Sequence, residues 1–294
     1  MDSVWKLPRG FSLTRRGRVE LIMRDAYRDQ LMERGIHNPE DLLPLHRDKA
    51  RFMEGRGLLV SLPINEKGSA RMVIRHYEHG GIFRALTRDL FIAGSRPLWE
   101  LIITEMARKA GVPTIEILAA IRRRVFWPIY KGDLVSKEIP NSLDLIQWLT
   151  RRAKAKDRKK VRDKRELIRQ AGRLVRQIHE VGIYHRDLHL KNFIVKVEER
   201  GAGSLHIIDF DRSAIVHPLK SHKWWANLMR LDRSIEKWQP KGIWITRTDR
   251  LRFLRSYLEG DQERRALVKT YLRKYPQRRR RYTIGWAIER LLYG

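Results

Sequence analysis

Two short stretches decide the fold: YHRDLHLKNFIV (Tyr184–Val195) and HIIDFDRS (His206–Ser213). The first places Asp187 ahead of Asn192, and the second ends an apolar run in Asp209. Both stretches contain short β-rich runs, and the turn sequence EERGAG between them predicts a hairpin. Because a hairpin folds the chain back on itself, we expect Asn192 and Asp209 to lie close together.

An acid, an amide and a second acid in this order suit phosphoryl transfer from ATP, which needs positioning and electrostatic stabilisation more than covalent chemistry. Asp187 is expected to accept the proton of the acceptor hydroxyl, while Asn192 and Asp209 offer hard oxygen ligands for Mg²⁺. Each residue alone has another interpretation: Asp187 as a carboxylate that caps a turn, and Asp209 as a strand-end acid paired with an Arg. Their occurrence together, in this order, favours a centre like that of protein kinases.

Three neighbouring positions depart from the protein-kinase pattern or have a separate role. His185 is predicted to brace the loop rather than to transfer a proton. Asp211 stands where protein kinases carry Gly, and three roles stay open for it: a metal ligand, a group behind the metal ligands, or an ion-pair partner of Arg212 or another neighbour. His189 stands where Ser/Thr kinases carry Lys, which leaves open whether another cation, such as Lys191, contacts the transferred phosphoryl group.

The residues upstream are expected to hold the nucleotide. Gly55 and Gly57 suit a loop over the phosphates, although a plain turn explains them equally well. Arg75, in the β-rich segment RMVIRHY, is expected to contact the phosphates unless it lies on the wet face of its strand. Glu100, ahead of Glu105 as the second choice, is expected to pair with Arg75.

Periodicity predicts the elements that carry these residues. Residues 57–77 form two β-rich runs around the turn signal NEKGS, which predicts a hairpin. A helix of about 14 residues follows, with Ser95 as its N-cap and Gly111 as its stop. Phe126–Tyr130 is predicted to be an inner strand, broken by Gly132. Residues 130–134 are expected to connect two lobes and to face the adenine, with Tyr130 and Lys131 as nucleotide contacts, unless Tyr130 is ordinary core.

The C-terminal half is predicted to be mainly helical. A stripe of apolar residues ends at Gly182, and Trp224, Trp225, Leu228 and Leu231 mark a later buried face. The fold class is therefore α+β, a protein-kinase-like fold with a β-rich N-lobe and a mainly helical C-lobe. The predicted division is an N-terminal extension (1–50), the N-lobe (51–133) and the C-lobe (134–294).

Composition limits the class of protein and its partners. The 294 residues include 63 Lys plus Arg and 34 Asp plus Glu, so the net charge is +29. Such a surface attracts polyanions. The absence of cysteine excludes disulfides and thiolate zinc sites, and a cytoplasmic location is expected. We find no apolar run long enough to span a membrane, so any contact with a membrane is expected at its surface.

Two basic runs stand out, RRAKAKDRKKVRDKR (Arg151–Arg165) and RKYPQRRRRY (Arg273–Tyr282). They are either solvated segments or sites that dock on anionic lipid, where each Lys or Arg contributes about 1 kcal/mol.

The chain resembles the bacterial lipopolysaccharide kinase family, nearest the Kdo (3-deoxy-D-manno-octulosonic acid) kinases. The resemblance is carried by GRG, VIRHYEHGG, YKGDLVSKEI, the two motifs quoted first and WWANLMRLDRSIEKW, which together run from about Gly55 to Lys237. It implies transfer of phosphate from ATP, with Mg²⁺, to the 4-hydroxyl of Kdo on a lipid A precursor. It also implies a peripheral location on the cytoplasmic face of the inner membrane.

Two alternatives stay open. One is a heptose kinase or another small-molecule or glycolipid phosphotransferase. The other is a catalytically silent kinase-like module that uses its basic runs to bind RNA or an anionic membrane. The presence of Asp187, Asn192 and Asp209 counts against a silent module, so nucleic acid is not the expected partner. No obligate protein partner is inferred.

Overall fold

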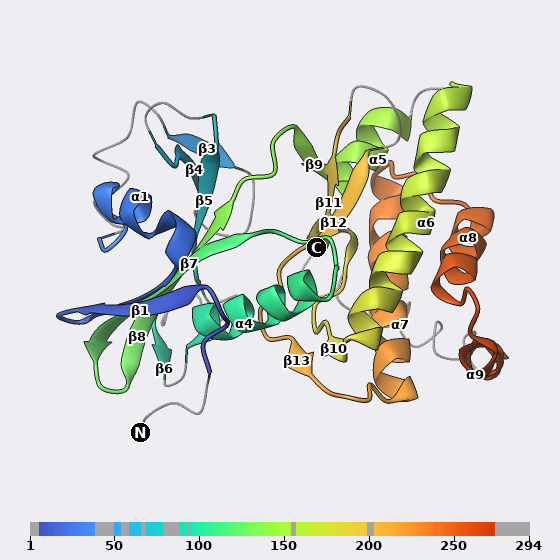
Figure 1. Cartoon of the computed structure of the whole chain (residues 1–294). Coiled ribbons are helices and arrows are strands. Elements are labelled where there is room, and N and C mark those ends of the chain that lie inside the picture. The colour runs from blue at the N-terminus through green and yellow to red at the C-terminus, as the bar shows by residue number, and fades with distance from the viewer. Residues whose placement is uncertain are drawn as a thin grey trace, which may run out of the picture.

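The computed structural model describes residues 6–38, 50–53, 59–65, 69–78, 89–92, 95–153, 157–198 and 203–273. Figure 1 shows a sheet with helices beside it in one half of the molecule and mainly helices in the other. The predicted α+β, two-lobe fold is confirmed. Among the described helices, none is both long and apolar enough to cross a bilayer.

The N-terminal half is built on an eight-stranded sheet in the order β1-β2-β7-β8-β5-β4-β3, with β6 paired to β8. Its strands are β1 (Phe11–Arg16), β2 (Val19–Arg24), β3 (Arg51–Met53), β4 (Leu59–Pro63), β5 (Arg71–His76), β6 (Phe91–Ile92), β7 (Ile117–Phe126) and β8 (Ile129–Lys137). The predicted hairpin across NEKGS is the antiparallel pair of β4 and β5. The central strands are buried on both faces: Leu21 and Met23 of β2 belong to one buried cluster, and Ile22 between them belongs to another that includes Leu101.

Residues 11–36 belong to this sheet half, where the sequence predicted a separate extension over residues 1–50. Strand β2 pairs with β7, and the 3-10 helix η1 (Asp25–Tyr27) and helix α1 (Arg28–Glu33) follow it. Leu31 and Ile36 are fully buried in the same cluster as Val135 of β8. The other predicted domain boundaries stay predictions.

Helix α4 (Arg96–Lys109) begins and ends where the sequence predicts. The side chain of Ser95 accepts a hydrogen bond from the backbone N–H of Leu98, and Gly111 adopts a φ of 78° after the helix. Gly132 does not break a strand, as the sequence suggested, but lies inside β8. A Cβ atom there would come within 2.7 Å of the Pro97 ring, so glycine lets the first turn of α4 approach the sheet.

The predicted inner strand at Phe126–Tyr130 is wrong. Phe126 ends β7 and Trp127 lies in the turn to β8, with 59% and 72% of their surface exposed. Only Tyr130 of this segment is fully buried. A short apolar run has the same pattern whether it lies in a core or at the tip of a hairpin, so periodicity could not separate the two.

The C-terminal half contains small sheets and packed helices. Its elements are β9 (Ser142–Asp144), α5 (Leu145–Ala153), α6 (Arg158–Glu180), β10 (Ile183–Tyr184), η2 (Leu190–Asn192), β11 (Phe193–Lys196), β12 (Ser204–Ile207), β13 (Ala214–Ile215), α7 (Ser221–Trp238), η3 (Gln239–Lys241), α8 (Arg247–Tyr257) and α9 (Gln262–Arg273). β11 and β12 form the predicted hairpin, and β9 joins them. The predicted apolar faces of α6 and α7 lie in one core.

The first basic run is partly structural. Asp157 caps α6 through a hydrogen bond from the backbone N–H of Lys159, and the run continues along the helix. Lys164 is buried, with its Nζ 2.8 Å from the carboxylate of Asp249 and 3.9 Å from the Trp244 ring centroid. Of the second run, only Arg273 lies within the described residues.

A neutral histidine joins three helices of this core. Nε2 of His179 in α6 lies 3.0 Å from Oδ1 of Asn227 in α7, and Nδ1 lies 2.9 Å from the hydroxyl of Tyr257 in α8. Since an amide oxygen accepts, Nε2 carries the proton and Nδ1 accepts from Tyr257. Burial lowers the pKa of His179 to about 3, against the favourable hydrogen bond to Asn227.

We predict that His179 makes the fold sensitive to acid. The unfolded chain binds a proton below pH 6.5, whereas the folded chain resists it until about pH 3, so stability falls as the pH drops through this window. The contribution lost between pH 6.5 and pH 4.5 is about 2 kcal/mol. Urea unfolding at several pH values should show a shallower pH slope for His179→Gln than for the wild type.

The exposed His222 in α7 supplies the control, because His222→Gln should keep the wild-type slope. Burial also lowers the pKa of His185, which adds a slope of the same sign to all three proteins. Equal slopes for His179→Gln and the wild type would contradict the prediction.

Candidate active site

The loop between β10 and η2 is fixed by two buried side chains. Asn227 Nδ2 donates to the His185 carbonyl at 2.7 Å, and Asn227 Oδ1 accepts from the His185 backbone N–H at 3.2 Å. The His185 ring accepts from the Asp187 backbone N–H through Nδ1 at 3.3 Å, which leaves Nε2 to donate to the Ile208 carbonyl at 3.1 Å. Burial lowers the pKa of His185, so the ring is neutral and braces the loop as predicted.

Asp187 presents its carboxylate at the surface of this loop, with 45% of the side chain exposed. His189 Nε2 lies 3.4 Å from one carboxylate oxygen, and Arg230 Nη1 lies 3.7 Å from the other. The Asp187 carbonyl accepts a hydrogen bond of 2.8 Å from Asn192 Nδ2. Because the amide nitrogen of Asn192 is held in this way, its oxygen is the atom of the side chain suited to bind a metal.

The sequence left the position of Lys191 open and did not indicate Arg230, and the structure places both of these cations near the loop. Lys191 Nζ lies 5.3 Å from the centroid of the Trp238 ring, so its ammonium group packs on α7. Arg230 comes from α7 and was not predicted, since nothing in the spacing of the sequence links it to Asp187. The structure therefore places the side chains of His189 and Arg230 beside the Asp187 carboxylate.

The β11–β12 hairpin brings Asp209 to the Asp187 loop, as predicted. Phe193 pairs with Ile207, and the Ile208 backbone N–H donates to the Asn192 carbonyl at 2.9 Å. Asp209 has a φ of 66°, a left-handed conformation that non-glycine residues adopt at a cost. Such strain is typical of functional sites and aims the carboxylate away from the strand direction.

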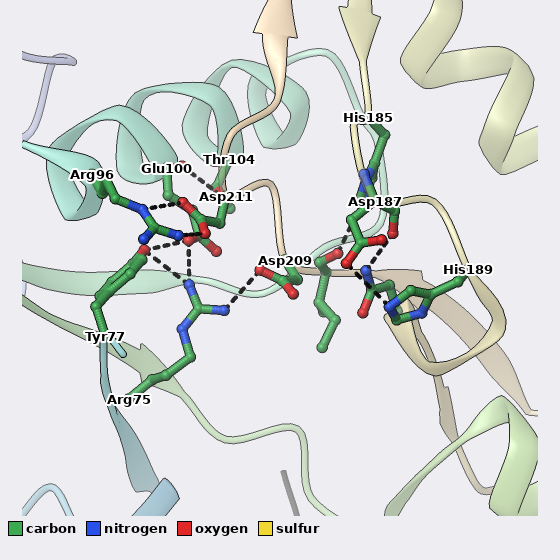
Figure 2. Close-up of polar contacts among 12 residues, drawn as sticks. Arg75, Tyr77, Arg96, Glu100, Thr104, His185, Asp187, His189, Asp209 and Asp211 are labelled. Atoms are coloured by element: carbon green, nitrogen blue, oxygen red, sulfur yellow. Dashed lines mark hydrogen bonds and ion pairs between the residues drawn. The ribbon is translucent and has the colours of Figure 1, made fainter. Parts of the chain in front are cut away.

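Arg75 of β5 joins Asp209 to helix α4. Its Nη1 donates to Asp209 Oδ1 at 2.9 Å, and its Nη2 donates to the Tyr77 hydroxyl at 2.9 Å and to the Glu100 carboxylate. The guanidinium carbon also lies 4.7 Å from the centroid of the Tyr77 ring. Figure 2 shows Arg75 between Glu100 and Asp209, with the Asp187 loop beyond Asp209. Arg75 therefore does not lie on a wet strand face.

Glu100 makes the pairing with Arg75 that the sequence predicts, and it is almost completely buried. The Tyr77 hydroxyl donates to the same carboxylate. Burial raises the pKa of Glu100 to about 7, and the positive charge of Arg75 opposes that rise. Glu105, the second choice, contacts Arg24 and Arg108 instead, so it does not reach this cluster.

Asp211 forms an ion pair with Arg96 in the first turn of α4, not with the adjacent Arg212. Arg96 Nε donates to Asp211 Oδ1 at 3.0 Å, and Nη2 contacts the other carboxylate oxygen. The Arg96 guanidinium also lies 5.2 Å from the centroid of Tyr77. Near this pair, Trp99 Nε1 donates to the Ser213 carbonyl at 2.8 Å. The start of α4 thus holds the segment after Asp209, and no sequence pattern pointed to Arg96.

The expected connector between the lobes is not at residues 130–134. These residues lie inside β8, where Leu134 pairs with Arg75 and with Ala120, so both edges of the strand are hydrogen-bonded. Tyr130 is buried and its hydroxyl accepts from the Arg96 backbone N–H at 3.2 Å, while Lys131 Nζ lies 3.0 Å from Asp89. Residues 138–141, between β8 and β9, connect the two halves.

The donor chemistry suits a hard cation. A carboxylate from Asp209 and an amide oxygen from Asn192 are ligands that Mg²⁺ accepts, and phosphate oxygens and water commonly complete its shell. Within the described part of the chain no cluster of three or more His, Cys, Asp or Glu residues forms a closed metal site. Gly55 and Gly57, predicted to cover the phosphates, lie outside the described residues.

We predict that Arg75→Lys is not conservative. A single ammonium group cannot reproduce the planar fork that contacts Asp209, Glu100 and Tyr77 together. Loss of one charged hydrogen bond should lower kcat/KM by about tenfold to a hundredfold, and Arg75→Met should lower it further. Phosphate transfer measured with ATP as the varied substrate checks this, with Arg71→Lys on the same strand as the control. Wild-type kcat/KM in Arg75→Lys would contradict it.

We predict a positioning role for Arg96. Arg96→Ala removes the partner of the Asp211 carboxylate, so kcat should fall by about tenfold and hydrogen exchange at residues 209–215 should become faster. Arg96→Lys should recover part of both changes. Arg108→Ala, on the same helix and 41% exposed, serves as the control. The same kcat and exchange rates in Arg96→Ala and Arg108→Ala would rule out the role.

Comparison with known proteins agrees with this geometry. Residues 44–257 match the lipopolysaccharide kinase (Kdo/WaaP) family. The chain is 29% identical over 191 residues to 3-deoxy-D-manno-octulosonic acid kinase of Haemophilus influenzae (strain PittEE), covering 63% of this chain and 73% of the relative. It is 33% identical over 187 residues to the Vibrio cholerae enzyme with the same name, covering 62% of this chain and 72% of that one.

A solved structure of WaaP in complex with acyl carrier protein shares the fold. The TM-score is 0.52 at 22% identity, and the match covers 83% of this chain and 95% of that chain. The family match extends from before β3 to the end of α8 and contains Arg75, Glu100, Asp187, Asn192 and Asp209. The chain therefore belongs to the lipopolysaccharide kinase (Kdo/WaaP) family.

Proposed function

We propose that this protein transfers the terminal phosphoryl group of ATP to the 4-hydroxyl of Kdo on a lipid A precursor. The family membership and the relatives named 3-deoxy-D-manno-octulosonic acid kinase support a Kdo acceptor. The hydroxyl and the lipid A precursor are inferences from the family resemblance. The reaction class is phosphate transfer to a sugar hydroxyl.

The observation that carries the proposal is the 2.9 Å contact between Arg75 and Asp209. It joins a strand of the large sheet to the end of β12, so a cation suited to phosphate and a carboxylate suited to a metal meet beside the Asp187 loop. The charge of Asp209 and the fork of Arg75 would hold each other in place until phosphates and a metal compete for them. No covalent chemistry is required of either residue.

Each residue then has a distinct task. Asp187 accepts the proton of the attacking sugar hydroxyl, since its carboxylate is the exposed acid of the loop. Arg75 binds the phosphates, and Glu100 keeps Arg75 in position. Asn192 and Asp209 would hold Mg²⁺, which when bound neutralises charge that develops on the phosphates.

The nucleotide contacts are revised from those first expected. Residues 138–141 replace Tyr130 and Lys131 as the segment proposed to face the adenine, because they lie between β8 and β9 and link the two halves. Gly55 and Gly57 keep their proposed place over the phosphates. Tyr130 acts instead as a core residue that positions Arg96.

We also propose that the protein works at the cytoplasmic face of the inner membrane. A glycolipid acceptor is embedded in a bilayer, and a net charge of +29 favours binding to anionic lipid. The alternatives remain a kinase of heptose or of another glycolipid, and a silent module that binds RNA or anionic membrane. A panel of acceptors separates the first alternative, and measurement of ATP turnover separates the second.

We predict that Asp187→Asn and Asp209→Asn each lower phosphate transfer by at least about a hundredfold. Both substitutions keep the side-chain shape but remove a charge that the chemistry needs. The measurement is transfer from labelled ATP, with Mg²⁺, to a Kdo-bearing lipid A precursor and to heptose-bearing acceptors. Glu263→Gln, an exposed acid in the first turn of α9, is the control for loss of one carboxylate.

Melting temperatures should stay within a few degrees of the wild type, on the order expected for surface changes. Near-normal transfer by either variant would overturn its assigned role. Transfer by the wild type only to heptose would replace Kdo as the acceptor. Salt-sensitive RNA binding without any ATP turnover would favour the silent module.

A further inference from the structure

Two neighbouring hairpin tips form a surface that the proposed chemistry does not use. Phe126, at the end of β7, and Trp127, in the turn to β8, are 59% and 72% exposed. Ile92 of β6 is 75% exposed, and it pairs with Ile129 of β8, which also pairs with Phe126. Because residues opposite each other in a ladder share a face, Ile92, Ile129 and Phe126 form one apolar row.

Exposed arginines lie at the ends of the adjoining strands. Arg15 and Arg16 end β1, Arg18 follows in the turn to β2, and Arg124 lies near the end of β7. The Arg124 backbone N–H donates to the Arg18 carbonyl at 2.9 Å, which fixes the two tips side by side. Figure 1 shows these hairpins at the end of the sheet farthest from the helical half.

The positive charge of this surface is only partly compensated within the described chain. Glu20 accepts ion pairs of 3.3 Å from Arg15 and from Arg122. Arg16 and Arg124 have no carboxylate within ion-pair distance among the described residues. Exposed aromatic side chains flanked by such cations are typical of segments that lie at the interface of an anionic bilayer.

We propose that the hairpin surface, made of Arg16, Ile92, Arg124, Phe126 and Trp127, docks the protein on an anionic membrane. This inference rests on the proposed glycolipid acceptor, and it names where the membrane binds. Phe126, Trp127 and Ile92 enter the interface between headgroups and acyl chains, and Arg16 and Arg124 contact lipid phosphates.

The surface is also close to the active centre along the chain. Ile92 in β6 precedes Arg96 at the start of α4, and Arg96 contacts Asp211. Phe91, beside Ile92, packs against Tyr130 with ring centroids 5.7 Å apart, and the Arg96 guanidinium lies 4.8 Å from the Phe91 centroid. Phe91 and Arg96 thus connect the docking surface to the segment that carries Asp209, the proposed metal ligand.

The basic run Arg151–Arg165 fits membrane docking less well. Its residue Lys164 is buried in an ion pair with Asp249, and Asp163 is buried as well. The exposed residues Arg158 and Lys159 offer charge, and no exposed apolar row lies beside them within the part of α6 that the structure describes. They therefore provide a charge-matched control for the hairpin surface.

The test is flotation of the full-length protein with vesicles of equal parts phosphatidylethanolamine and phosphatidylglycerol. Phe126→Ser with Trp127→Ser should weaken binding by at least about tenfold, because the apolar row is lost. Arg16→Gln with Arg124→Gln should weaken it by roughly tenfold to thirtyfold, at about fivefold for each charge, and added salt should reduce this difference.

Two controls should bind within about threefold of the wild type, since surface charges far from the bilayer act weakly. One is Arg158→Gln with Lys159→Gln. The other is Leu251→Ser with Leu272→Ser, two exposed apolar residues of α8 and α9. All variants should transfer phosphate to a detergent-dispersed acceptor at the wild-type rate, because no substituted residue belongs to the active centre.

Normal flotation of both hairpin variants would overturn the docking surface, as would a wild type that does not float. Loss of flotation only in the Arg158 and Lys159 variant would move the docking site to α6 and also overturn the proposal. Protection of the two tips from hydrogen exchange by a soluble acidic protein, but not by vesicles, would assign the surface to a protein partner instead. Failure of transfer in detergent by the wild type would count against the proposed function and not against docking.

Discussion

The fork of Arg75 is the contact on which the rest of the active centre depends. One guanidinium group contacts Asp209 through Nη1 and Glu100 and Tyr77 through Nη2, so it fixes β5, α4 and the end of β12 relative to one another. Glu100 is buried, which raises its pKa to about 7, and the positive charge of Arg75 opposes that rise. In return, Glu100 fixes the direction of the fork. A lysine offers no such fixed geometry.

The second acid of the DFD sequence extends this network. A glycine at position 211 would allow the backbone to change conformation, whereas Asp211 is tied to Arg96 in the first turn of α4. Arg96 and Arg75 both lie over the ring of Tyr77, at 5.2 and 4.7 Å from its centroid. Helix α4 therefore contacts the Asp209 segment directly through Arg96 and Asp211, and through Glu100 by way of Arg75. In the described geometry the helix is thus packed against the active centre.

Local sequence patterns predicted much of this structure, but they could not predict contacts between residues that are far apart in the chain. Hairpins, the bounds of α4 and the order of Asp187, Asn192 and Asp209 depend on turn residues and spacing, so the sequence contains them. Arg96 and Arg230 reach the centre through tertiary packing, which spacing does not encode. Residues 130–134 were predicted to connect the lobes, but this apolar, β-rich segment lies inside β8, which is paired along both edges.

The same limit explains why Phe126–Tyr130 was wrongly predicted to be an inner strand. The alternation of apolar and polar residues in a sequence cannot distinguish aromatic residues at a hairpin tip from those of an inner strand, whereas their burial in the structure can. Several acids pair with inward arginines: Arg24 with Glu105, Arg75 with Glu100 and Asp209, and Arg123 with Asp133. These carboxylates stabilise the fold and the site, and they do not pair with the outer Arg16 and Arg124. The chain as a whole has an excess of 29 positive charges, and at the hairpin tips exposed arginines stand beside exposed aromatic side chains.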